Sequence, residues 1–262
     1  MKLESCVLLG FVACAVAAPN GAREAHIAAS KAVLPDNKLP QWLGAGDMSA
    51  KDASVLVFEA LVKLDEVLKH QEQTSSQIAS IAEDDLVENG ILDNAPCQPL
   101  TMIFARGTNE MGNMGKGIGR PLAAALRAKT GNKVIVQGVN YDATPEGNLL
   151  LGLNGGPVMA DLVKQSVAQC PDSKIVLAGY SQGAMVTHAG KLLTHEEISA
   201  IVVFGDPGRF VPFVNIAPEK TKEYCNKGDP VCLNGFDLDA HSEYAMHADS
   251  AATFLIETSG AK

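Results

Sequence analysis

The chain has 262 residues, enough for one large α/β domain or two small ones, and 47% of them are apolar, which suits a globular core. Its formal net charge is −9, and no stretch gathers lysine and arginine. The phosphates of a nucleic acid would be repelled, so the charge argues against a nucleic-acid partner but does not choose among other substrates.

The first 17 residues have the pattern of a secretory signal. Lys2 precedes an apolar run from Cys6 to Ala17, and Ala15 with Ala17 forms a small-x-small cleavage site. We place cleavage after Ala17 or the following alanine. The run is too short to span a bilayer, and no later segment reaches about 18 uninterrupted apolar residues. The sequence therefore predicts a secreted, extracellular protein without a membrane span.

Four cysteines remain once the signal and its two cysteines are removed. An even number in an oxidising compartment predicts two disulfides, with three pairings possible. A zinc site is the alternative, but the two nearest cysteines are not spaced as CxxC and no histidine pair completes a ligand set. We expect no metal. The four cysteines that remain are Cys97, Cys170, Cys225 and Cys232.

Residues 18–82 form a predicted N-terminal extension. Its first part is turn-rich and shows no period, and Ser49 with Asp52 then resembles a capping box that opens an amphipathic helix ending near His70. Three interpretations stay open: a helix packed on the main domain, a propeptide, or a helix that binds a partner. The pattern favours the first only slightly.

The main domain is predicted to span residues 83–262. Strand-like apolar runs alternate with helix-like segments, which indicates a parallel sheet flanked by helices. The strand-like runs are residues 101–104, 133–136, 174–178 and 200–204, and the clearest helical segments are residues 121–129 and 158–169.

A glycine-rich stretch, residues 112–119, lies between the first strand and the first helix, as a nucleotide-binding loop would. It contains no GxGxxG, and Lys116 is followed by Gly117 rather than by serine or threonine. The stretch matches neither the dinucleotide-binding motif nor the phosphate-binding loop motif, so we expect no nucleotide cofactor.

The run GYSQG at residues 179–183 follows an apolar strand-like stretch and has the pattern of a nucleophile elbow. Taken alone it fits an ordinary glycine-rich turn equally well. A nucleophilic Ser181 requires a base, an orienting carboxylate and backbone donors for an oxyanion. Asp229, then His241 and His247, follow in the chain order of the α/β-hydrolases.

Four motifs together resemble the secreted cutinases, which are serine esterases. They are ARGTNE at residues 105–110, GYSQG at 179–183, CNKGDPVC at 225–232 and HSEY at 241–244. The resemblance covers about residues 83–258. It implies a three-layer α/β-hydrolase fold with a central, mostly parallel sheet flanked by helices, to which this chain adds the N-terminal helical extension.

The resemblance also assigns roles to the catalytic residues. It implies Ser181 as nucleophile, Asp229 as triad acid and His241 as general base. Tyr244 three residues later completes the family's His-x-x-Tyr, which favours His241 over His247. The reaction implied is acyl transfer from an ester through an acyl-enzyme, without metal or organic cofactor.

Further roles follow from the same resemblance. The backbone N–H groups of Thr108 and Gln182 should form the oxyanion hole. Cys97 should pair with Cys170, and Cys225 with Cys232. Two apolar loops should border the cleft and contact the substrate, through Leu149, Leu150, Leu151 and Leu153 in the first and Leu233, Phe236 and Leu238 in the second.

The function predicted is a monomeric secreted cutinase that hydrolyses aliphatic esters such as the plant polyester cutin. An acetylxylan esterase on the same scaffold is the nearest alternative, although 5% aromatic residues is low for a sugar site. A secreted host-interaction protein that has lost the reaction is the alternative of another class, against which the intact serine, aspartate and histidine argue.

Overall fold

A computed structural model of the protein describes residues 86–261. The predicted signal peptide and the predicted helix of the N-terminal extension lie outside these residues.

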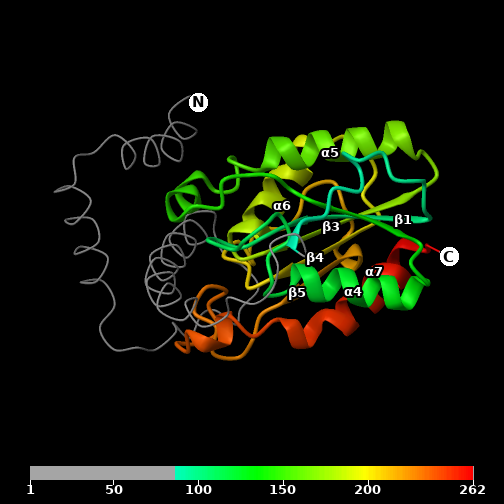
Figure 1. The fold of residues 1–262 in the computed structure, drawn as a ribbon. Coiled ribbons are helices and arrows are strands. Elements are labelled where there is room, and N and C mark those ends of the chain that lie inside the picture. The colour runs from blue at the N-terminus through cyan, green and yellow to red at the C-terminus, as the bar shows by residue number, and fades with distance from the viewer. Residues whose placement is uncertain (1–85, 262) are drawn as a thin grey trace, which may run out of the picture. The chain divides into compact units, whose positions relative to one another are not determined.

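A five-stranded parallel sheet forms the centre of the described region (Figure 1). The strands follow the order β2-β1-β3-β4-β5, with β1 and β3 in register from Leu100 and Lys174 to Ala105 and Gly179. The first four strands confirm the sequence prediction, whereas β5 was not predicted. The strands are β1 (Leu100–Ala105), β2 (Val134–Gly138), β3 (Lys174–Tyr180), β4 (Ala200–Phe204) and β5 (Thr221–Tyr224).

Helices of the described region cover both faces of the sheet (Figure 1). Helices α5 (Gly156–Gln169) and α6 (Gln182–Leu193) pack together on one face, and α4 (Gly119–Thr130) and α7 (Ala248–Ser259) on the other. This arrangement confirms the predicted three-layer α/β fold.

The sheet separates two hydrophobic clusters, and alternate strand residues enter opposite clusters as the pleat requires. On β1, Met102 and Phe104 join the cluster beneath α4 and α7, while Ile103 and Ala105 join the one beneath α5 and α6. Burial on both faces explains why these strands appear in the sequence as continuous apolar runs.

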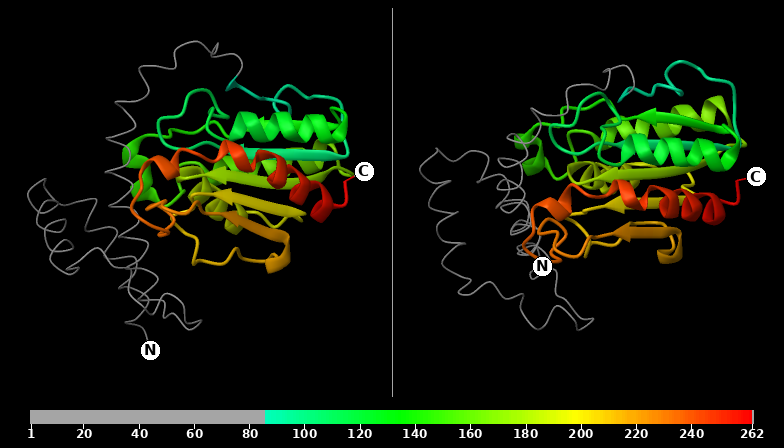
Figure 2. Two further views of the ribbon diagram at one scale, coloured as in Figure 1. Left: turned by 90° about the horizontal axis from the view of Figure 1, so that it is seen from below. Right: turned by 60° about the horizontal axis from the view of Figure 1, so that its bottom comes forward.

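The carboxyl ends of the strands meet at one edge of the sheet, where Figure 2 shows the arrowheads and the loops that follow them. In parallel α/β folds this edge is where ligands bind. The loop after β1 carries Thr108, that after β3 carries Ser181, and that after β5 carries Asp229. Four short 3-10 helices lie in the connections of the described region: η4 (Pro145–Leu150) between β2 and the next helix, η5 (Pro218–Lys220) directly before β5, and η6 (Asp239–His241) and η7 (Ala245–His247) after β5.

Two disulfides brace the fold. Cys97, before β1, is bonded to Cys170 at the end of α5, and Cys225 is bonded to Cys232 across the loop that follows β5. These are the pairs that the cutinase resemblance implies. Within residues 86–261, no helix combines the length and apolar character needed to cross a membrane.

Candidate active site

Ser181 lies on the sharp turn between β3 and α6. Its backbone has φ 55° and ψ −120°, a strained conformation of the kind that concentrates at functional sites. The turn leaves no room for side chains beside it: a Cβ on Gly179 would lie 2.2 Å from the carbonyl oxygen of Gly183, and one on Gly183 would lie 2.0 Å from that of Ala105. These distances explain both glycines of the GYSQG motif.

Ser181, His241 and Asp229 form a continuous chain of hydrogen bonds. The serine Oγ lies 3.0 Å from His241 Nε2, and His241 Nδ1 lies 2.8 Å from Asp229 Oδ2. An ionised carboxylate only accepts, so Nδ1 carries a proton and the neutral ring presents Nε2 as the acceptor for the serine hydroxyl. All three residues are buried. This arrangement is competent for general-base activation of an alcohol.

The environment of Asp229 keeps its carboxylate ionised. Burial raises the pKa of Asp229, but hydrogen bonds from His241, from the hydroxyl of Tyr244 and from the N–H of Val231 outweigh burial and hold the pKa below its ordinary value. The sequence motif contained Tyr244 without revealing that its hydroxyl donates to the same oxygen, Oδ2, that receives His241.

Two other histidines of the described region pair with groups away from Ser181. His247 Nε2 lies 2.7 Å from Asn226 Oδ1. His188, on α6, pairs with Asp206 at 2.8 Å and stacks on the ring of Phe213 with centroids 3.8 Å apart. The structure thus brings His241, rather than His247, to the serine.

The two predicted oxyanion residues lie on different elements: Thr108 is in the loop after β1, and Gln182 directly follows Ser181. Gln182 opens α6, where the first N–H groups have no partner within the helix. Thr108 Oγ1 donates to Asn148 Oδ1 at 3.3 Å, and the side chain of Gln182 donates to the carbonyl of Thr144 at 2.9 Å. The segment containing η4 therefore anchors both predicted oxyanion residues. No sequence pattern indicates Asn148, because only the fold brings it to Thr108.

Glu110 is half-buried and anchors the loop that carries Thr108. Its carboxylate accepts the N–H groups of Gly107 and Gly117, each at 2.8 Å. Burial raises its pKa, and the N–H groups oppose that rise. A Cβ on Gly115 would lie 2.3 Å from the Glu110 carboxyl carbon. The glycine-rich stretch thus wraps around a carboxylate of the protein itself.

Glu110→Gln should destabilise the fold by about 1–3 kcal/mol, because the amide offers one acceptor oxygen and turns its NH2 toward a buried N–H donor that then loses its partner. Turnover should also fall, since Gly107 precedes Thr108. Urea unfolding and ester hydrolysis measure the two effects. Glu257→Gln, at an exposed position on α7, is the matched control. A Glu110→Gln variant as stable as the wild type would contradict this role.

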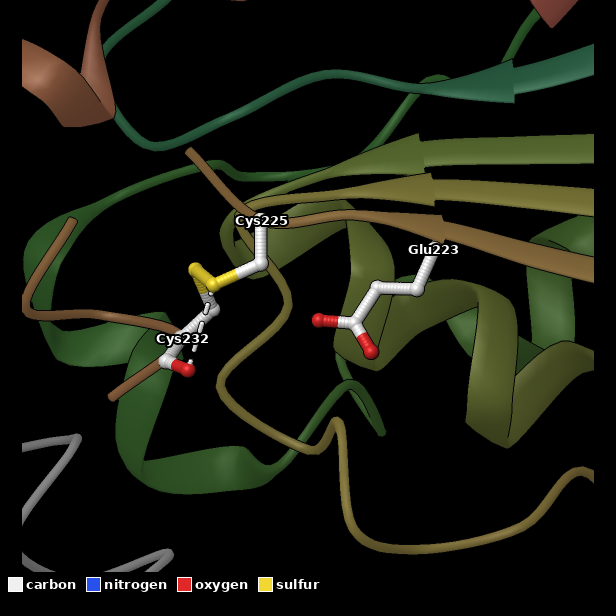
Figure 3. Close-up of side chains that lie close together, drawn as sticks. All are labelled: Glu223, Cys225 and Cys232. Atoms are coloured by element: carbon white, nitrogen blue, oxygen red, sulfur yellow. Dashed lines mark hydrogen bonds between the residues drawn. A yellow bond between two sulfur atoms is a disulfide. The ribbon is translucent and has the colours of Figure 1, made fainter. Parts of the chain in front are cut away.

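Arg209 forms a hydrogen bond with the loop that contains Asp229. Its Nη1 donates to the carbonyl of Cys232 at 2.8 Å, and its Nε lies 3.5 Å from Glu223 Oε1. Glu223, Cys225 and Cys232 lie as close together as metal ligands would (Figure 3). The two sulfur atoms are joined in a disulfide, so they are not available as thiolate ligands.

Glu223 should give the stability of the protein a distinctive pH dependence. Burial raises the pKa of Glu223 from 4.5 to about 7, although Arg209 opposes the rise. Between these values the folded state holds a proton that the unfolded state has lost. The contribution of Glu223 to stability therefore falls, by as much as about 3 kcal/mol, as pH rises through this window.

Glu223→Gln removes this titration, so the free energy of unfolding of the variant relative to the wild type should increase from pH 5 to pH 8. Urea unfolding at several pH values measures the difference. Glu219→Gln, at an exposed position nearby, should show no such trend. A constant difference between Glu223→Gln and wild type would refute the assignment.

The predicted substrate-contacting residues all retain some exposure. Leu150, Leu153 and Phe236 are 44%, 61% and 51% exposed. The others are half-buried: Leu149, Leu151, Leu233 and Leu238. The first loop includes η4, which the contacts of Thr108 and Gln182 place beside the serine, and the second joins Asp229 to His241 along the chain.

Sequence comparisons identify relatives of this chain. A family profile described as Cutinase matches residues 96–259. Cutinase 4 of Emericella nidulans is 49% identical over 173 residues, which cover 66% of this chain and 77% of the relative. A cutinase of Botryotinia fuckeliana is 39% identical over 178 residues, covering 65% of this chain and 88% of the relative.

Solved structures extend the comparison. A Trichoderma reesei cutinase in complex with a C11Y4 phosphonate inhibitor has a TM-score of 0.63 and 32% identity, covering 79% of this chain and 99% of that one. An acetylxylan esterase has a TM-score of 0.51 and 20% identity, covering 63% of this chain and 100% of that one. The second likeness establishes a shared fold only.

Proposed function

Because the chain belongs to the cutinase family of carboxylic ester hydrolases, we propose that Ser181, His241 and Asp229 are the triad with which it cleaves its substrate. The observation that carries this proposal is the continuous hydrogen-bonded chain from the serine Oγ to the buried carboxylate. A complete triad geometry also argues against the alternative of a non-catalytic host-interaction protein.

The proposed reaction has two steps. His241 Nε2 takes the hydroxyl proton as Ser181 Oγ attacks the ester carbonyl, and the imidazolium then delivers that proton to the departing alcohol. Asp229 stabilises the transient imidazolium. In the second step His241 takes a proton from water, which attacks the acyl-enzyme and releases the carboxylic acid. The protonated ring returns the proton to Ser181.

The developing oxyanion requires donors that are in place before the reaction. We assign this role to the backbone N–H groups of Thr108 and Gln182. The Thr108 hydroxyl bonds to Asn148 and the Gln182 side chain to Thr144, so both residues are held in place by the same neighbouring segment. This anchoring supports an oxyanion hole that needs little rearrangement on substrate binding.

The proposed substrates are aliphatic esters, with the polyester cutin as the natural candidate. The partly exposed leucines of residues 149–153, together with Leu233, Phe236 and Leu238, provide a surface suited to an aliphatic chain. A cutinase with 49% identity supports this class of substrate over the acetylated sugars of the structural neighbour with 20% identity. Acetylated xylan is retained as the alternative substrate.

The predicted secretory signal and the two disulfides support an extracellular location, which we also propose. The enzyme is proposed to act as a monomer. Residues 18–82 are proposed to be a separate N-terminal extension, and intact-mass measurement of the secreted protein will determine whether they are retained.

A substrate panel tests the proposed specificity. p-Nitrophenyl esters from acetyl to long acyl chains, acetylated xylan and cutin should be compared with Ser181→Ala as the background control. We expect hydrolysis of aliphatic esters and release of cutin monomers. Activity confined to acetyl groups on xylan would favour the alternative, and equal rates for wild type and variant would exclude the enzymatic proposal.

A further inference from the structure

We infer that Asn226 and His247 are positioning residues that hold His241 against Asp229, an inference that rests on the proposed function. Neither side chain contacts the reacting serine. Their contacts connect the two halves of the triad, which lie on different segments of the chain.

The side-chain amide of Asn226 forms hydrogen bonds with the backbone on both sides of His241. Its Nδ2 donates to the carbonyl of Ala240 at 2.9 Å and to that of Glu243 at 3.0 Å. These two carbonyls precede and follow the histidine in the chain. The Asn226 amide, which belongs to another loop, therefore holds the backbone on either side of His241, while the carbonyl of His241 itself accepts from the hydroxyl of Tyr180 at 2.7 Å.

Asn226 also forms a backbone hydrogen bond with Asp229, the proposed acid of the triad. Its carbonyl accepts the N–H of Asp229 at 3.0 Å, and its own N–H donates to the hydroxyl of Tyr244 at 3.1 Å. That hydroxyl in turn donates to Asp229 Oδ2. One residue thus connects the aspartate loop, the histidine segment and the tyrosine that supports the carboxylate.

His247 determines which way the Asn226 amide faces. Both Nδ2 protons are used by carbonyls, so Oδ1 must accept, and His247 Nε2 donates to it at 2.7 Å. Burial and the nearby Lys222 lower the pKa of His247, which favours the neutral ring. The ring packs beside Tyr224, with centroids 4.8 Å apart, and lies at the start of α7. His247 therefore has a defined donor atom and a fixed ring plane.

This network predicts a specific kinetic defect. If the amide is lost, the backbone on either side of His241 loses two hydrogen bonds and only the bond from Tyr180 remains at the His241 carbonyl, so the bond from His241 to Asp229 should weaken while the acyl-binding surface is unchanged. The turnover number should fall at a constant KM. A weaker bond to Asp229 also stabilises the imidazolium less. The low-pH side of the pH profile of kcat/KM, called the acid limb below, reports the pKa of the base in the free enzyme. This acid limb should therefore move to lower pH.

Four variants test the inference on a soluble p-nitrophenyl ester. Asn226→Ala should lower kcat by about 10–100-fold, as small misplacements of catalytic groups do, and shift the acid limb to lower pH. His247→Met removes the donor and should act in the same direction, by about tenfold. His247→Gln restores an N–H donor and should recover most of that loss. His195→Met makes the same chemical change at an exposed site and serves as the control.

The outcomes separate this inference from the proposed function. If the wild type is active, Ser181→Ala is inactive and Asn226→Ala keeps its turnover, the triad stands and the positioning role is wrong. If kcat falls but the acid limb stays in place and His247→Gln is as impaired as His247→Met, the residues support folding only and the inference is again wrong. An inactive wild type would refute both the proposed function and the positioning inference. Circular dichroism and melting temperature confirm that each variant is folded.

Discussion

Replacing Ser181 with alanine should lower kcat by about 10⁶-fold, the order of magnitude found when the nucleophile of a serine hydrolase is removed. The cause is the loss of the acyl-enzyme route: without the Oγ, His241 has no alcohol to deprotonate. The remaining rate should reflect substrate binding and the oxyanion donors. Substrate affinity itself should change little, because the hydroxyl is a small part of the binding surface.

Two measurements check this result. Steady-state hydrolysis of a p-nitrophenyl ester gives the rate. An activated alkyl phosphonate should add its phosphorus to Ser181 of the wild type, detectable by mass spectrometry, and should leave the variant unlabelled. His241→Ala should be impaired to a comparable degree, and His247→Ala much less. A Ser181→Ala variant that retained turnover or phosphonate labelling would contradict the proposed nucleophile.

Replacing Asp229 with asparagine should lower kcat by about 10⁴-fold while leaving the fold intact. The N–H of Val231 bonds Oδ1 at 2.7 Å, so the asparagine oxygen is expected at that position and its NH2 toward His241. The amide would then donate to Nδ1, and the ring proton would move to Nε2. In that tautomer Nε2 cannot accept the proton of Ser181.

The pH profile and a matched variant provide the control for this prediction. Asp206→Asn makes the same change in another buried aspartate that pairs with a histidine at the same distance, 2.8 Å, but lies outside the proposed triad. It should lose less than about tenfold in kcat. Comparable losses in both variants would indicate a general structural effect rather than tautomer control by Asp229.

The sequence predicted the central layer well because buried parallel strands leave a strong signal. The runs 101–104, 133–136, 174–178 and 200–204 are apolar on both faces, and each corresponds to a strand. Strand β5 has the sequence TKEY and is half-exposed at the sheet edge, so it shows no apolar run. Its assignment depends on pairing with β4, which no local pattern reports.

The candidate site was predictable to a similar extent. The motifs contained Ser181, Asp229 and His241 because each lies in a distinctive local sequence. The roles of Glu110, Asn148 and Asn226 follow from contacts with residues that the fold brings near. Hydrogen bonds of this kind leave no periodicity. The glycine-rich stretch is an example, because its Gly117 N–H bonds the carboxylate of Glu110 and no motif in the sequence indicates that contact.

The two disulfides differ in what they contribute. Cys97 and Cys170 are separated by 73 residues, and closing so long a loop restricts the unfolded chain by about 4 kcal/mol in the chain-entropy account. Cys225 and Cys232 are separated by 7, for which the same account gives about 2 kcal/mol. The long crosslink thus mainly lowers the entropy of the denatured ensemble. The short one also closes the loop that carries Asp229, so losing the long crosslink should lower the thermal stability of the protein more than losing the short one.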